Sequence, residues 1–376
     1  MEYKDILITT IESTYPKYLQ EKVKKKLEGN NVISSEGDLF SANGESVEID
    51  QEDSLIGQLL TVLNLKTNDT IKHIEDLEYF NAYKYATLFT LNNYNHEFLQ
   101  RLIERGTIVP YSPENTDVCT DFSDDNITAK PTFRKINDTI DCLKFSNKVT
   151  GYLPIRENNE KTVKYTILVL IHKELNTLEI RLDKIKGYFK NGDEFFYIRQ
   201  ISYVVAWLKR HLNLELAPVN LPPVIEFIRP HLFGDGEVKV TAQAMDLATG
   251  SKAILDTGIN DEFVLPLLGE LKNLIDDNTV LFDSNNETKE IKSLLNNFIM
   301  ETEQTASLPW ISLTWTNEVK SKAIKVKFSF NPEYTLLYYY GSNAEMERMN
   351  NVTRYLIDNR TEYLKQEAQS EQGSEV

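Results

Sequence analysis

Residues 165–171 read Tyr-Thr-Ile-Leu-Val-Leu-Ile and form the longest apolar run of the chain. A continuous apolar run predicts a strand that is covered on both faces. A turn is predicted at residues 173–176, which read Lys-Glu-Leu-Asn. The residues after it alternate apolar and charged side chains: Leu178, Glu179, Ile180, Arg181, Leu182 and Asp183. Alternation of this kind predicts a neighbouring strand with one face in water.

A helix is predicted directly after this strand pair. Its apolar residues recur at helical spacing: Ile198, Ile201, Val204, Val205, Leu208 and Leu212. We expect this apolar side to pack on the two strands, because an amphipathic helix buries its apolar stripe. Residues 144–230 are therefore predicted to form a central α+β unit.

The rest of the chain is predicted to place a helical domain before this unit and a second α+β unit after it. Residues 1–110 read mainly as helices, with Pro16 interrupting the first and a longer one at residues 70–91. Residues 111–143, which are rich in Asp, are predicted to be an acidic linker. Residues 231–376 again show strand patterns followed by a C-terminal helix. The predicted fold class is α+β, with both sheets mostly antiparallel.

Composition narrows the classes of function. The 376 residues carry a formal net charge of −16, which argues against nucleic-acid binding over the whole surface but leaves room for a local basic patch. The chain has two cysteines, so a disulfide framework is not expected. No apolar segment approaches the roughly 18 residues that span a bilayer. We therefore expect a cytoplasmic protein with no membrane contact.

Two groups of charged residues are candidates for a catalytic or metal site. Glu270-Leu-Lys272, with Asp256 or Asp261 upstream, has the letters of a metal-dependent nuclease, but its surroundings predict a helix, whereas the motif requires a strand. Glu179, Arg181 and Asp183 could bind a metal or an anion, yet the same pattern is typical of a half-exposed strand. No catalytic residue, metal ligand or cofactor is predicted.

The C-terminal sheet carries the most suggestive surface. A lysine-rich segment forms one predicted strand, and tyrosines lie on the expected partner strand: Lys320, Lys322, Lys325 and Lys327, with Tyr338 and Tyr340. Lysines and tyrosines that share one sheet face can neutralise phosphates and stack on bases. The alternative is a solvent-exposed sheet whose lysines prevent aggregation.

Three functional hypotheses follow. The first is a non-catalytic binding or assembly protein whose partner is a nucleic acid on the lysine and tyrosine surface, another protein, or a second copy of the chain. The second is a metal-dependent nuclease or other hydrolase with a site built from dispersed carboxylates. The third is a regulator that reads DNA through its N-terminal helices, where Arg101 and Arg105 are the basic residues and Glu97 and Glu104 oppose them.

Overall fold

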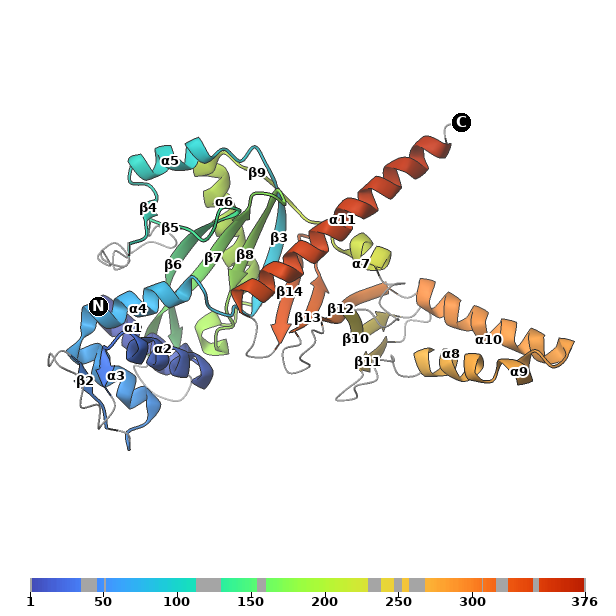
Figure 1. The fold of residues 1–376 in the computed structure, drawn as a ribbon, viewed down its shortest axis with the longest axis horizontal. Helices are drawn as coiled ribbons and strands as arrows, with labels where there is room; N and C mark the ends of the chain where they lie inside the picture. Colours follow the sequence, from blue (N-terminus) through green and yellow to red (C-terminus); the bar gives the residue numbers. More distant parts are fainter. Residues whose placement is uncertain are drawn as a thin grey trace. The chain divides into compact units, whose positions relative to one another are not determined.

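The computed structural model divides the chain into two compact units, Met1–Ala217 and Pro218–Val376. It describes the following residues: 2–34, 46–50, 52–112, 130–153, 160–228, 238–246, 252–256, 268–305, 307–315, 324–340 and 345–374. Each unit combines helices with a mostly antiparallel sheet (Figure 1). The predicted α+β class is confirmed. The four-part division of the chain stays a prediction.

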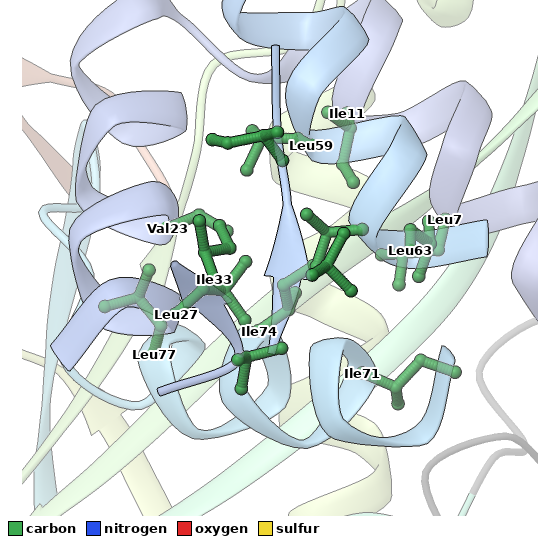
Figure 2. Close-up of a cluster of buried hydrophobic side chains, with 14 of the residues drawn as sticks. Leu7, Ile11, Val23, Leu27, Ile33, Leu59, Leu63, Ile71, Ile74 and Leu77 are labelled. Atoms are coloured by element: carbon green, nitrogen blue, oxygen red, sulfur yellow. The ribbon is translucent and has the colours of Figure 1, made fainter. Parts of the chain in front are cut away.

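The first unit begins with four helices that share one apolar core. They are α1 (Tyr3–Thr14), α2 (Lys17–Gly29), α3 (Leu55–Leu65) and α4 (Thr67–Glu78), accompanied by the short parallel strands β1 (Ile33–Ser34) and β2 (Val47–Glu48). Pro16 separates α1 from α2, as predicted, because its ring cannot continue a helix. Leu7, Leu27 and Leu63 are fully buried between these elements (Figure 2).

The helix predicted over residues 70–91 is wrong in its second half. Helix α4 ends at Glu78, and residues 85–92 form strand β3 (Tyr85–Asn92). Every residue from Tyr85 to Phe89 is buried. A segment that is buried on both faces shows no alternation, so its apolar run cannot be distinguished from a helical one by period alone.

The sheet of the first unit is ordered β3-β8-β7-β6-β5-β4, and β9 pairs with β3. Its further strands are β4 (Val109–Pro110), β5 (Thr132–Lys135), β6 (Ile140–Tyr152), β7 (Glu160–His172), β8 (Thr177–Leu182) and β9 (Glu215–Pro218). The predicted pair of strands is confirmed as β7 and β8, which run antiparallel with Ile171 opposite Leu178. Strand β5 and the start of β6 lie in the range predicted as a linker.

The expectation that β8 has one face in water is wrong. All six residues of β8 are buried, including Glu179 and Arg181. The strand lies between β3 and β7 in the interior of the sheet, so neighbouring strands flank it on both sides. Its charged side chains are satisfied by each other and by a histidine, so their alternation does not mark a wet face.

Helix α6 (Phe196–Leu212) packs on this sheet as predicted. The Trp207 ring meets the Phe145 ring of β6 edge-on at 5.2 Å between centroids, and the Phe196 ring meets the Tyr165 ring of β7 at 5.5 Å. Val204 and Leu208 are fully buried, whereas Val205 is only half-buried. Two further elements connect the strands and helices of this unit. Helix α5 (His96–Glu104) precedes β4, and a 3-10 turn, η2 (Gly187–Lys190), precedes α6.

The second unit forms an antiparallel sheet ordered β11-β10-β12-β13-β14. Its elements are α7 (Pro222–Ile228), β10 (Val238–Asp246), β11 (Lys252–Asp256), α8 (Leu268–Asp277), α9 (Thr279–Phe282), α10 (Asn286–Thr305), β12 (Ser307–Trp315), β13 (Ile324–Phe330), β14 (Thr335–Tyr340) and α11 (Met346–Ser374). Met349, Val352 and Leu356 of α11 are buried as predicted, but Leu364 is exposed. Among the described helices, none is both long and apolar enough to cross a bilayer.

Candidate functional site

Two lysines and two tyrosines lie opposite each other on β13 and β14. Lys325 pairs with Tyr340, and Lys327 pairs with Tyr338, in one antiparallel register. Directly opposed residues of antiparallel strands project from the same side of a sheet. We call this surface, together with Trp310 of β12, the Lys/Tyr face. Lys320 and Lys322 lie outside the described residues.

The opposite side of the same strands is the buried side. Val326, Phe328 and Leu337 are fully buried there. The Trp315 ring stands perpendicular to the Tyr355 ring of α11, with 5.7 Å between their centroids. Helix α11 therefore covers one side of the sheet, and the alternation of the strands directs the lysines and tyrosines to the other.

Trp310 extends the Lys/Tyr face onto β12. The ammonium of Lys327 lies 3.9 Å from the centroid of the Trp310 ring, within cation–π distance. Partial burial lowers the pKa of Lys327. The aromatic ring thus holds this ammonium at a defined position on the face.

An acidic residue lies at the edge of the Lys/Tyr face. The Lys325 ammonium is 3.7 Å from a carboxylate oxygen of Asp256, the last residue of β11. Burial raises the pKa of Tyr340, and the negative charge of Asp256 raises it further. Since Asp256 attracts the same lysine that a phosphate would use, it would compete with an anionic ligand.

The chemistry of this face suits a ligand with both planar and anionic parts. Trp310, Tyr338, Lys325 and Lys327 are half-buried, and Tyr340 is 49% exposed. Aromatic rings can stack on bases whatever their sequence, and lysines next to them can neutralise phosphates. The arrangement therefore offers groups for stacking and for charge neutralisation.

The residues Glu179, Arg181 and Asp183 do not form one site. Arg181 holds Glu179 in a two-pronged ion pair, with Nε–Oε1 at 2.7 Å and Nη2–Oε2 at 2.8 Å, and His172 Nε2 lies 3.0 Å from Oε2. Burial would raise the pKa of Glu179, but Arg181 and His172 outweigh it and lower the pKa to about 2. Glu179 and Arg181 of β8, with His172 of β7, thus form a buried ion-pair cluster inside the sheet.

Asp183 has a different environment from its two neighbours. One carboxylate oxygen accepts a hydrogen bond from the Lys184 backbone N–H at 2.8 Å. Burial raises the pKa of Asp183 to about 6, because that hydrogen bond and the attraction of Lys84 are too weak to offset it. The environment of Asp183 therefore disfavours its charged form. Asp183 lines a cavity of about 60 Å³ that Glu78 and Lys164 also line.

A buried charge network under the N-terminal helices was missed in the sequence analysis. Lys144 of β6 and Lys164 of β7 both pair with Glu75 of α4. Their ammonium groups also lie 3.0 and 2.7 Å from the Glu78 carboxylate. The Tyr3 hydroxyl of α1 donates a hydrogen bond to Glu75. We call these five residues the buried network.

The buried network is electrically balanced, with two carboxylates and two ammonium groups. Burial would raise the pKa of Glu75, but Lys144 and Lys164 outweigh it and lower the pKa to about 2. The sequence contains a pattern that could have indicated these buried charges. Lys144 interrupts the apolar segment Cys142-Leu-Lys-Phe145, and Glu75 and Glu78 share one side of a helix. Its lysines and carboxylates are 66 to 89 residues apart, so spacing alone could not join them.

The letters of a nuclease motif fall on a helix, as predicted. Glu270 and Lys272 belong to α8, and the Lys272 side chain is exposed. Asp261 lies outside the described residues. Within the part of the chain that the structure describes, no three His, Cys, Asp or Glu side chains gather as a metal-binding group. The hydrolase hypothesis stays untested.

The helix proposed to read DNA is α5. Arg101 lies 3.8 Å from Glu97 and over the Phe98 ring, so its charge is already opposed within the helix. Arg105 caps the C-terminal end of α5 and lines a cavity, which is considered below. The regulator hypothesis also stays a prediction.

Neither a scan against protein-family models nor a search of curated proteins gives a match for this chain. Any assignment of function therefore has to rest on the residues and their geometry.

Proposed function

We propose that this protein is a non-catalytic binding protein, and that its Lys/Tyr face holds single-stranded nucleic acid. The observation that carries the proposal is the register of β13 and β14, which sets Lys325 beside Tyr340 and Lys327 beside Tyr338. A row of lysines on β13 thus lies beside a row of tyrosines on β14, on one side of strands whose other side is buried. This combination supports stacking on bases together with contacts to the phosphate backbone.

The net charge of −16 opposes this binding but does not preclude it. Affinity for phosphate depends on local charge, and Lys325 and Lys327 of the Lys/Tyr face bring two ammonium groups, of which that of Lys325 lies near the carboxylate of Asp256. We expect weak binding that is best observed at low salt, because each neutralised phosphate releases a counterion. We also propose that this binding takes place in the cytoplasm.

Fluorescence anisotropy with a labelled oligothymidylate at low salt tests the proposal. The double variant Lys325→Glu, Lys327→Glu should strongly weaken binding without unfolding the sheet, because both side chains are partly exposed. Asp256→Asn should strengthen binding severalfold, since it frees the ammonium of Lys325 from a competing carboxylate. A gain of affinity is a sharper test than a loss, because general damage to the fold cannot produce it.

The matched control reverses the same amount of charge elsewhere in the second unit. Lys252→Glu, Lys365→Glu changes two exposed lysines, each of which pairs with its own acid, Asp246 or Glu362. This control should keep most of the binding. Absence of binding at low salt, or an equal loss in the control variant, would contradict the proposal.

A second candidate function, self-assembly, is favoured by an exposed apolar surface on α8, α9 and α10. These helices form a hairpin that extends from strands β10 and β11 (Figure 1, orange). One side is buried around Ile275 and Ile299. The same helices also expose large apolar side chains: Leu274, Val280, Leu281, Ile291, Leu294 and Phe298. Exposed apolar patches of this kind are typical of protein contacts, and we propose a second copy of the chain as the occupant.

A second copy fits because a twofold interface brings the same patch of both chains together, and an apolar stripe is complementary to itself. Light scattering coupled to gel filtration should show a dimer. Leu294→Glu should yield a monomer with unchanged folding, because Leu294 is 63% exposed. A monomeric wild-type protein at high concentration would contradict self-assembly.

A further inference from the structure

A cavity of about 560 Å³ opens on the first unit between the end of α5 and the outer side of α6. Cavities of roughly 300 to 1,000 Å³ are the usual size of small-molecule sites. Arg105, at the C-terminal end of α5, lines this cavity, and so does Lys130, which lies two residues before β5. Helix α6 contributes Tyr203, Trp207, Arg210 and His211.

The charge of this cavity is opposite to that of the whole chain. Arg105, Lys130 and Arg210 are basic residues, and among the described residues that line the cavity none is Asp or Glu. Like charges that face one space repel each other. An anion in that space relieves the repulsion, and guanidinium groups bind phosphate oxygens with particular strength.

Local backbone structure positions two of these cations. Arg105 caps α5, and Gly106 turns the chain with a φ of 64°, a conformation that glycine adopts without strain. A Cβ atom at Gly106 would lie 4.0 Å from the Lys130 ammonium, so Lys130 crosses directly over this turn. The two cations therefore come from segments 25 residues apart that meet at the glycine.

An aromatic wall forms the side of the cavity that belongs to α6. Tyr203, Trp207 and His211 follow at four-residue spacing and so share one side of the helix. The Trp207 ring is fixed by the buried Phe145 ring, and the His211 imidazole stacks on it at 4.5 Å with 27° between the planes. This wall is preorganised for contact with a flat heterocycle.

The helix dipole explains part of this charge. Basic residues are favourable at helix C-termini, and Arg105, Arg210 and His211 all lie at such ends. The dipole does not explain why the C-terminal ends of α5 and α6 face one cavity. It also does not explain why Lys130, from a third segment, lines the same cavity. It also does not account for the aromatic wall.

We propose that this cavity binds a nucleoside phosphate, with the phosphate between Arg105, Lys130 and Arg210 and the base against Trp207. The site lies in the first unit and goes beyond the binding proposed for the Lys/Tyr face. The ligand is either a free nucleotide or one nucleotide of a strand, and both present the same chemistry. Burial and the neighbouring Arg210 lower the pKa of His211, which leaves its ring largely neutral for stacking.

Isothermal titration calorimetry with ADP, adenosine, inorganic phosphate and oligothymidylate tests the proposal. ADP should bind at least about tenfold more tightly than adenosine or phosphate, because only ADP engages both the cations and the aromatic wall. Arg210→Glu should weaken ADP binding by about tenfold or more. Trp207→Phe, which keeps the ring contact with Phe145, should weaken ADP binding less than Arg210→Glu does. We also expect ADP to change the tryptophan fluorescence of the wild type, and Trp207→Phe should remove that change.

The matched control is Lys209→Glu, an identical charge change on the neighbouring exposed residue of α6 that does not line the cavity. It should leave ADP binding nearly unchanged, and the thermal melting curves of both variants should agree with that of the wild type. If Arg210→Glu unfolds the protein, Arg105→Ala tests the same cation cluster from α5.

The outcomes divide cleanly. Binding of ADP that depends on Arg210 supports a free nucleotide, whereas binding of oligothymidylate alone that depends on Arg210 supports a nucleotide within a strand. Absence of both, equal affinity for phosphate and ADP, or an equal loss in Lys209→Glu overturns the proposal. The variant Lys325→Glu, Lys327→Glu should not change ADP binding, so failure of either site is distinguishable from failure of the other.

Discussion

Lysines on strands lie next to tyrosines in both units of this protein, with opposite consequences. In the first unit, Lys144 and Lys164 project under α1 and α4, where Glu75, Glu78 and Tyr3 surround them and exclude water. In the second unit, Lys325 and Lys327 remain partly exposed beside Tyr338 and Tyr340. The strands look alike in sequence, and the difference lies in what covers them. A lysine under a helix that supplies carboxylates stabilises the fold, and a lysine without such a cover remains available to a ligand.

The largest expected effect compares one lysine from each region. Lys164→Ala should lower the free energy of unfolding by about 3 to 5 kcal/mol, because it leaves buried carboxylates without their cation. Lys325→Ala should lower it by no more than about 1 kcal/mol, since its ion pair with Asp256 is partly exposed. Urea denaturation followed by circular dichroism measures both. Equal losses would mean that the Lys/Tyr face is as structural as the buried network.

The next largest expected effect is a loss of stability at low pH, which should come from the buried carboxylates of the first unit and not from the Lys/Tyr face. The pKa of Glu75 and of Glu179 is lowered from the ordinary value of 4.5 to about 2 in the folded protein. Their stabilisation is therefore present in full above pH about 4.5 and disappears as the pH falls toward 2, by up to roughly 3 kcal/mol for each.

The urea midpoint measured from pH about 6 down to about 2.5 should therefore fall steeply. Glu75→Gln, although less stable throughout, should show a shallower fall. Lys325→Ala should follow the wild-type profile, because Lys325 contacts neither carboxylate. A profile for Glu75→Gln as steep as that of the wild type would contradict the assigned role of Glu75.

A smaller effect of opposite sign is expected at Asp183, which lies beside the buried network. Its pKa is raised from the ordinary value of 3.8 to about 6, so the folded protein binds this proton more tightly than the unfolded chain. The resulting stabilisation is complete below pH about 3.8 and is lost as the pH rises through 6. Asp183→Asn should therefore raise stability at pH about 8 by about 2 kcal/mol and have little effect near pH 3. No gain at pH 8 in thermal melts would show that Asp183 is adequately solvated.

The smallest effect concerns salt. If two phosphates contact Lys325 and Lys327, binding of oligothymidylate should weaken about sevenfold between about 50 and 200 mM salt, from a slope of about −0.7 per phosphate on single strands. The melting temperature should change little over the same range, because the ion pairs of the buried network are hidden from the screening ions. Binding that does not depend on salt would contradict phosphate contacts.

The class of fold could be predicted from local pattern. The apolar run at residues 165–171, the turn after it and the stripe of α6 specify strand, strand and helix through side-chain periodicity, and the structure confirms them. The alternation of Lys325 and Lys327 opposite Tyr338 and Tyr340 likewise follows from two strands joined by a tight turn. In each case the residues that interact are close in sequence, so their spacing contains the information.

Tertiary structure alone decided which charges are buried and which are open. Glu179 and Arg181 look like a wet strand face in sequence, yet β8 lies inside the sheet and the two side chains neutralise each other. Strand β3 was predicted as helix, because a segment buried on both faces has no alternation to reveal it. Arg105, Lys130 and Arg210 meet around one cavity from three separate segments. Whether a charged side chain meets water, a counter-charge or a ligand depends on distant segments that fold over it, and no local period encodes that.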